Sequence, residues 1–127
     1  MGHQSLANET GQVWTANAWT VEEIRERMEG LLEHFSGRLP NNLDAHVVLK
    51  PNLNNDLVAL SGNCTDLRVL ISLIEGLQRR GYRNLTIADG SNVGVDRRGI
   101  DTFKRLRIDA LAERCDVRTV NLNLENG

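Results

Sequence analysis

The chain has 127 residues, of which 40% are hydrophobic and 25% are charged, and its formal net charge is −2 at pH 7. This length and composition are typical of a single folded domain with its own hydrophobic core. Charges of both signs are interspersed and only 4% of the residues are aromatic, so the sequence lacks the basic stripe and the stacking platform of nucleic-acid-binding proteins.

The two cysteines, Cys64 and Cys115, form no Cys-x-x-Cys pair. The chain therefore carries no ligand set for an iron–sulfur cluster or zinc, and a small disulfide scaffold is equally unsupported. Reduced thiols fit a reducing compartment, so we expect a cytoplasmic protein. No apolar run approaches the ~18 residues that a transmembrane helix needs, and the N-terminus has no apolar leader, so we expect no membrane partner.

Residues 1–19 are predicted to form an irregular N-terminal arm, and residues 20–127 a single α/β domain. The arm is rich in small polar residues, and Trp14 and Trp19 are its large anchors. The size of these side chains favours docking of both onto the domain surface, with contact to a partner as the alternative.

A first amphipathic helix is predicted over residues 21–36, because apolar residues recur there at helical spacing. Thr20 is a suitable N-cap, and Glu23 stands three residues later, as in a capping box. Gly37 and Pro40 then end the helix.

A buried strand is predicted over residues 45–50, and Pro51 ends it because proline cannot donate to a ladder. The polar segment 51–64 follows as a long loop, a length that is often functional. The next helix, residues 66–80, has a clean apolar stripe, and Thr65 is its N-cap candidate.

The second strand is predicted over residues 84–88, and the glycine-containing loop 89–94 follows it. This loop matches neither the dinucleotide-binding glycine pattern nor a P-loop. A third helix is marked by Ile100, Phe103 and Leu106, and it continues or restarts after Arg107. Residues 117–122 are the third strand.

This order of elements predicts an α/β fold with a βαβαβ core and an N-terminal helix. We expect a three-layer, Rossmann-like, mostly parallel sheet, because right-handed crossovers place helices on the sheet faces. In such sheets ligands bind at the carboxyl ends of the strands. The candidate ligand-binding residues at that edge are Lys50, Asn52, Thr65, Asp66, Asp89, Gly90, Ser91 and Asn92.

Each of these candidates also has a purely structural interpretation. Lys50 could pair with a phosphate or carboxylate, or simply extend into solvent. Thr65 could serve only as a helix cap, and Asp66 would repel an anion while favouring the helix dipole. Asp89 and Gly90 could bind a metal, a ribose hydroxyl or an amine, or form no more than a tight turn.

Other polar residues favour structural roles. The segment Asp96–Arg98 is most simply a solvated turn, although its arginines could clamp an anion. Cys64 stands near a helix start, where the pKa of a thiol can fall, but no histidine is close in sequence to activate it. The three histidines lack metal-ligand spacing, and no catalytic residue can be assigned.

The segment Val48–Leu53 contains Lys-Pro-Asn at its centre and resembles the strand end of the uncharacterised family "domain of unknown function number 362". The resemblance covers residues 45–123 and continues through 62–67, 81–90, 91–106 and 117–122. One departure is the helix start, where Thr65-Asp66-Leu67 stands and many members carry a proline at the third position.

Members of this family are typically longer, and some carry a ferredoxin-like iron–sulfur segment. The resemblance therefore implies an N-terminal or stand-alone lobe that binds its ligand in a cleft against a second lobe. The activity of the family is unsettled, so the resemblance bears on fold and site placement more than on chemistry. Whether the chain is an enzyme, and which cofactor it uses, stay open.

Three functions remain after this reasoning. The first is a lobe that binds a small anionic molecule, in which Lys50 pairs with the anion, Asn52 and Thr65 orient it, and Asp89 takes a metal or a proton. The second is a non-catalytic interaction or oligomerisation module that holds a partner, a second lobe or a second copy. The third, implied only by the resemblance, is an accessory domain of iron–sulfur-linked redox proteins. The first predicts that Lys50 and Asp89 share one edge of the sheet.

Overall fold

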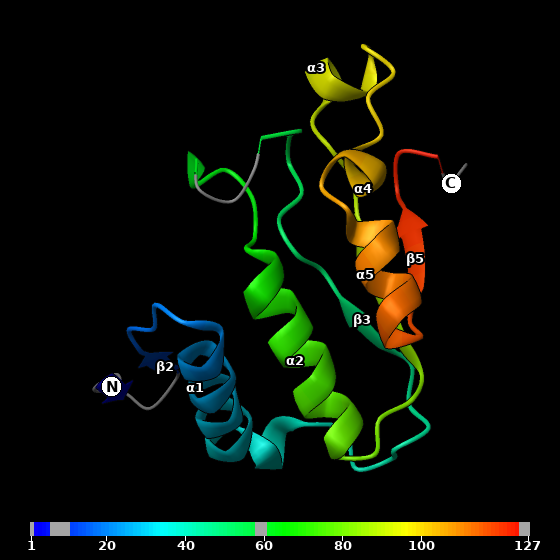
Figure 1. The fold of residues 1–127 in the computed structure, drawn as a ribbon. Helices are drawn as coiled ribbons and strands as arrows, with labels where there is room; N and C mark the ends of the chain where they lie inside the picture. Colours follow the sequence, from blue (N-terminus) through cyan, green and yellow to red (C-terminus); the bar gives the residue numbers. More distant parts are fainter. Residues whose placement is uncertain (1, 6–10, 58–60, 125–127) are drawn as a thin grey trace.

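The computed structural model describes residues 2–5, 11–57 and 61–124. Within them, three parallel strands form one sheet in the order β3-β4-β5 (Figure 1). Their bounds are Val47–Leu49 for β3, Leu85–Asp89 for β4 and Arg118–Asn121 for β5. Strand order thus follows chain order, and every strand runs in the same direction.

The helices between these strands begin and end close to the predicted positions, except in the last crossover. Helix α2, Leu67–Arg79, joins β3 to β4. The predicted third helix restarts after Arg107, one of the two expected alternatives, and forms α4 (Thr102–Arg105) and α5 (Ile108–Cys115). A further short helix, α3 (Val93–Asp96), lies in the segment that was predicted to be a loop and a turn. The break before α4 falls at Gly99 with φ +69°, and the break before α5 falls at Arg107 with φ 62°. A left-handed residue cannot continue a right-handed helix, which is why the segment divides.

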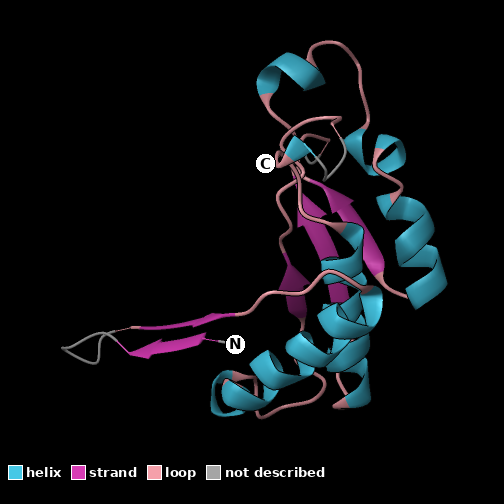
Figure 2. Cartoon of the chain, turned by 60° about the vertical axis from the view of Figure 1, so that its left-hand side comes forward, coloured by secondary structure: helices cyan, strands magenta, loops and turns pink. Residues whose placement is uncertain are grey.

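The predicted α/β class, the Rossmann-like parallel sheet and the βαβαβ core with an N-terminal helix are confirmed. The layering differs from the expected three layers, because α2 and α5 contact one another on the same face of the sheet (Figures 1 and 2). With strand order equal to chain order, right-handed crossovers all run in one direction and deliver both helices to the same side. On the opposite face, Val48 is 53% exposed.

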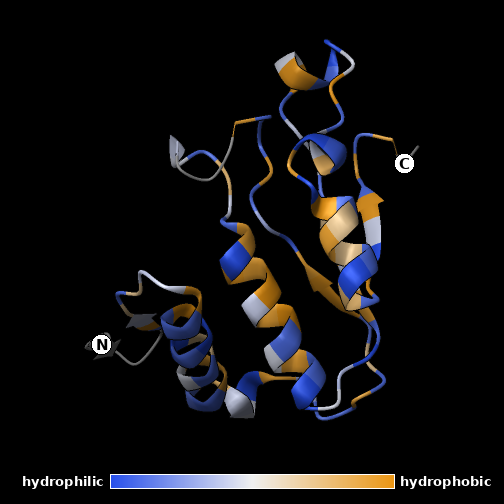
Figure 3. Ribbon diagram, viewed as in Figure 1, coloured by the Kyte–Doolittle hydropathy of each residue, from blue (hydrophilic) through white to orange (hydrophobic). Residues whose placement is uncertain are grey.

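The core lies between the sheet and α2 and α5. Figure 3 shows the apolar stripe along α2, and the buried side chains of its members Leu70, Ile74 and Leu77 belong to one cluster with Leu85 and Ile87 of β4. Burying such side chains is the main driving force for folding. In the described residues, none of the helices combines the length and the apolar character that crossing a membrane requires.

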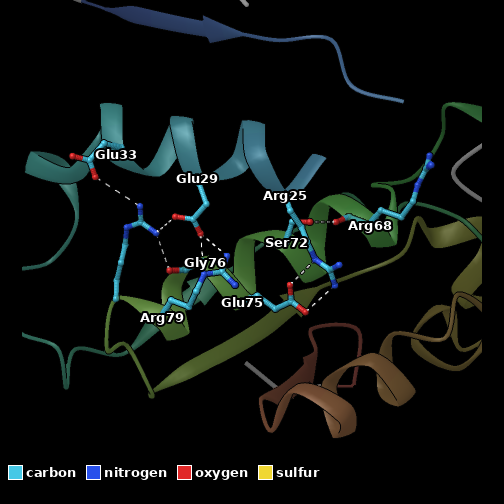
Figure 4. Close-up of polar contacts among 9 residues, drawn as sticks. Arg25, Glu29, Glu33, Arg68, Ser72, Glu75, Gly76 and Arg79 are labelled. Atoms are coloured by element: carbon cyan, nitrogen blue, oxygen red, sulfur yellow. Dashed lines mark hydrogen bonds and ion pairs between the residues drawn. The ribbon is translucent and has the colours of Figure 1, made fainter. Parts of the chain in front are cut away.

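Helix α1, Val21–His34, packs against α2 and is followed by the short 3₁₀ helix η1, Ser36–Arg38. The predicted capping box is confirmed, since Thr20 Oγ1 accepts from the Glu23 N–H and the Glu23 carboxylate accepts from the Thr20 N–H. Ion pairs join the two helices along their length. Figure 4 shows the ion pair between Arg25 and Glu75 and the ion pair between Arg79 and Glu29.

The N-terminal arm is more regular than predicted. Strands β1, Gly2–Ser5, and β2, Gln12–Thr15, pair in antiparallel fashion, so the expectation of an irregular arm was wrong. The run Gln-Val-Trp-Thr in β2 is rich in residues that favour strands, a signal that outweighs the polar composition around it. Of the two tryptophans, Trp14 docks onto the domain as expected. Its ring lies 3.4 Å from the position that a Cβ would occupy at Gly30 of α1, whereas Trp19 is 83% exposed.

Candidate functional site

The carboxyl ends of the three strands meet at one edge of the sheet, near the top of Figure 1, beside the loop that follows β3 and the helix α3. We call this region the strand-end edge and define it by Lys50, Asn52, Asp89, Ser91 and Asn92. Lys50 Nζ lies 2.8 Å from Asp89 Oδ1. The two residues therefore share one edge, as the sequence predicts.

Asp89 ends the fully buried strand β4 and is itself 4% exposed. Its second carboxylate oxygen accepts the backbone N–H of Leu53 at 2.7 Å, and its carbonyl accepts the N–H of Leu122 at 3.0 Å. Both carboxylate oxygens are thus engaged by the chain. Asp89 holds the segment after β3 in place and positions the Lys50 ammonium, rather than standing ready as a metal ligand or a base.

The Lys50 side chain is 69% exposed although its charged end is anchored. An ammonium group has three N–H donors. Lys50 can therefore keep its ion pair with Asp89 and still donate to a ligand that approaches from solvent. This combination of a fixed position and an open side is what a site for an anion needs.

Asn52 and Thr65 close the long loop between β3 and α2. The Asn52 N–H donates to Thr65 Oγ1 at 2.9 Å, and the Thr65 N–H donates to the Asn52 carbonyl at 2.9 Å. The Asn52 side-chain amide also donates to the Asn63 carbonyl at 3.1 Å. The prediction that Thr65 is the N-cap of α2 was therefore wrong. Asp66 takes that role, and its carboxylate accepts from the Arg68 N–H.

Asp66 lies apart from the other candidates. Its carboxylate also pairs with the Arg68 guanidinium at 2.7 Å and lines a cavity beside Trp14. The hydrogen bonds from the Arg68 side chain, together with its charge, hold the pKa of Asp66 below its usual range. Asp66 thus stays charged and acts in helix capping, away from Lys50 and Asp89.

The segment after β4 is held by short polar contacts. The Asn92 N–H donates to the Asn54 carbonyl at 2.8 Å, and Asn92 Oδ1 caps α3 by accepting from the Val95 N–H at 3.0 Å. The Asn123 amide donates to Ser91 Oγ at 2.8 Å. These bonds join the segments after all three strands into one network.

Gly90 allows a close approach, but by the chain itself. A Cβ at this position would overlap with Asn123 Oδ1 and would also lie 3.6 Å from the Leu122 Cβ. Gly90 is therefore required for packing of the segment after β5 against β4. Its absent side chain leaves no space for a ligand on that side.

A cavity of about 540 Å³ opens beside the strand-end edge, between the loop after β3 and α3. Asn92 lines it together with Asn55, Asp56 and Arg98. The Asp56 carboxylate lies 3.6 Å from Arg98 and 4.0 Å from Arg105, so Arg98 does more than form a solvated turn. Sequence reasoning overlooked Asn55 and Asp56, although they directly follow the Lys-Pro-Asn-Leu-Asn run.

Cys64 is turned into the same loop, where its Sγ donates to the Asn55 carbonyl at 3.3 Å. This contact supports the structural interpretation of the thiol over the reactive one. Among the described residues, no group of three or more His, Cys, Asp or Glu side chains is placed to hold a metal ion.

Comparison with protein families finds a match to the family described as "Domain of unknown function (DUF362)" over residues 47–126. The matched range begins at β3 and runs past β5, so it includes every residue of the strand-end edge. Comparisons with curated proteins and with solved structures found no match.

Proposed function

We propose that the strand-end edge binds a small anionic molecule. The chain that carries it belongs to the family described as Domain of unknown function (DUF362). The observation that carries this proposal is the Lys50–Asp89 pair, in which an exposed ammonium rests on a buried carboxylate.

The Lys50 side chain is partly ordered before a ligand arrives. A free lysine has roughly 2 kcal/mol of side-chain entropy to lose on binding. The ion pair with Asp89 already restricts this freedom, so less is lost when a ligand accepts from the same ammonium. Pre-ordering of this kind raises affinity without any new contact.

Charge around the edge supports an anion rather than a cation. Lys50, Arg98 and Arg105 face two acidic groups, Asp56 and Asp89. The arginine pairs with Asp56 are long, at 3.6 and 4.0 Å, so each guanidinium retains donors for a carboxylate or phosphate. The neighbouring amides of Asn52 and Asn92 would orient such a group.

A thermal-shift and calorimetric titration with phosphate, pyrophosphate, citrate and a nucleoside triphosphate tests the proposal. A ligand that binds only the folded state stabilises it by about 2.7 kcal/mol at a hundred times its dissociation constant. We expect one of these anions to raise the melting temperature of the wild type and of Lys104→Met, a matched change at an exposed lysine, but not of Lys50→Met.

The Lys50→Arg variant keeps the charge and should retain part of the effect. Circular dichroism must show that each variant is folded. An anion that stabilises Lys50→Met as much as the wild type would place binding elsewhere, and no stabilisation by any anion would remove the proposal.

A second candidate is a module that binds a second lobe or a second copy of the chain. It is favoured by the exposure of two large apolar side chains, Trp19 at 83% and Leu124 at 72%. Light scattering across a concentration series tests it. An increase in mass that Trp19→Ser or Leu124→Ser abolishes would support this function over a purely ligand-binding one.

A further inference from the structure

A separate cavity of about 470 Å³ lies between the N-terminal arm, α1 and the first turn of α2. We call it the arm cavity. Figure 1 shows β2 beside α1, with the chain between them passing over the start of the helix. Its volume falls in the range of roughly 300–1,000 Å³ that small-molecule sites occupy. None of the residues of the strand-end edge lines it.

The walls of the arm cavity are largely apolar. Trp14 of β2 closes one side, and Ile24, Met28 and Leu31 of α1 form another at helical spacing. An apolar tail that displaces water from these walls gains free energy in proportion to the surface that it covers. The lining therefore favours a hydrocarbon group in the body of the cavity.

Arg27 provides the polar end of the cavity. Its Nε atom is buried, and among the buried side-chain nitrogens and oxygens of the described residues it is the one that has no hydrogen-bond partner. Its Nη1 lies 3.7 Å from the Glu26 carboxylate, which is beyond hydrogen-bond distance. A guanidinium that is not held by a bidentate acceptor can turn to meet one that enters the cavity.

The neighbouring arginines are already engaged. Arg25 donates to both carboxylate oxygens of Glu75, and Arg68 donates to Asp66 through two of its nitrogens. Of the two arginines that line the cavity, Arg27 therefore has the less engaged guanidinium. The carboxylates of Glu26 and Glu23 interact with its charge, and Asp66 lines the same cavity, so a doubly charged phosphate would be repelled more strongly than a single carboxylate.

We propose that the arm cavity binds a small amphipathic monocarboxylate, with its carboxylate on Arg27 and its hydrocarbon tail against Trp14, Ile24 and Met28. The site is independent of the strand-end edge. Its ligand differs in class from the polar anion proposed there, because the walls are largely apolar and the contact proposed for the charged group is the Arg27 guanidinium.

Fluorescence titration of the full chain tests this proposal with octanoate as the probe. The Trp19→Phe background leaves Trp14, in the cavity wall, as the only tryptophan of the sequence. We expect a saturable change in Trp14 emission with octanoate. Acetate, which lacks the tail, and octanol, which lacks the charge, should each bind at least about tenfold more weakly.

Variants in the same background separate the two contacts. Arg27→Met should weaken octanoate binding about tenfold or more, whereas Arg38→Met, the same change on the exposed helix η1, should leave it unchanged. Ala18→Leu, which places a larger side chain in the cavity wall, should abolish the signal. If Arg27→Met is not folded by circular dichroism, Arg27→Lys replaces it and should also weaken binding.

Three results would overturn the proposal. They are no saturable change with octanoate, octanol binding as tightly as octanoate, and octanoate binding to the Arg27 variant as tightly as to its parent. Because Lys50 lies outside the arm cavity, Lys50→Met should bind octanoate normally. The outcome here is therefore separate from that of the strand-end edge.

Discussion

Lys50 Nζ and Asp89 Oδ1 lie 2.8 Å apart, although the first side chain is 69% exposed and the second only 5%. This unequal burial gives the two partners different roles. Asp89 needs its partners, because a buried carboxylate without them is costly. Lys50 could move to solvent at little cost of its own, and its place in the site follows from the carboxylate beneath it.

Removing either partner of this pair should therefore have unequal effects. We expect Lys50→Met to lower the free energy of unfolding by about 1–3 kcal/mol, since the Asp89 carboxylate stays buried and loses one of its donors. Asp89→Ala should cost more, because it also removes the bond from the Leu53 N–H and leaves a cavity. Urea denaturation measures both, with Lys104→Met as the exposed control.

The double variant Lys50→Met/Asp89→Asn provides the decisive comparison. With the charge of Asp89 removed, Lys50→Met should cost little further. Equal costs of Lys50→Met in the wild-type and Asp89→Asn backgrounds would show that the ion pair contributes nothing to stability.

Gly90→Ala should destabilise the protein by about 1–3 kcal/mol, because the added methyl group overlaps with Asn123 Oδ1. In an Asn123→Ala background the same change should cost much less, since the obstructing atom is gone. Gly37→Ala is the matched control, as nothing lies within 4 Å of a Cβ there. Thermal unfolding of the four variants tests this, and an undiminished cost in the double variant would contradict it.

Arg107→Gly should raise the free energy of unfolding by about 0.5–1 kcal/mol. Arg107 stands at φ 62° before α5, and a left-handed conformation costs a non-glycine residue roughly 1–2 kcal/mol. Part of that gain is offset by the greater chain entropy of glycine in the unfolded state. Arg114→Gly, inside α5, should lower stability instead. The same sign for both variants in urea denaturation would refute the argument.

The Glu29 ion pair should make stability depend on pH in the acid range. The Arg79 side chain, followed by that of Arg80, holds the pKa of Glu29 below its ordinary value of 4.5. A lowered pKa in the folded state stabilises it fully above the unfolded value and loses that effect as pH falls through the folded value. The stability difference between wild type and Glu29→Gln should therefore shrink from pH 7 to pH 3.

Partial exposure limits the size of this effect. The Glu29 side chain is 38% exposed, so solvent screens its ion pairs and we expect a difference of at most about 1 kcal/mol at pH 7. Urea denaturation at both pH values in low salt measures it. A difference that is constant across this range, or that grows in acid, would be the wrong sign.

Local signals in the sequence determined the class and order of elements. The capping box of Thr20 and Glu23 needs only residues three apart, and the apolar stripe of α2 needs only helical periodicity. Strands β3, β4 and β5 were recognised because each is a short apolar run bounded by polar loops. Such patterns depend on neighbours within a few residues, so they can be interpreted without a fold.

The sequence left open whether the third helix continues or restarts after Arg107, because the choice depends on a backbone angle there that composition does not reveal. The N-cap of α2 is Asp66 and not the predicted Thr65 for a related reason. Thr65 Oγ1 is taken by the Asn52 N–H from across the loop, which leaves the neighbouring carboxylate to cap the helix.

Only the tertiary structure decided which candidate residues meet. The sequence placed Lys50 and Asp89 at the same edge, because parallel strands end together, but their direct contact depends on strand register. Packing between segments far apart in the chain decides two further points. It places Asn123 in the space beside Gly90, and it places Asp66 on another surface. The shared face of α2 and α5 likewise follows from strand order, which no local pattern encodes, because pairing between distant strands is set by the whole fold.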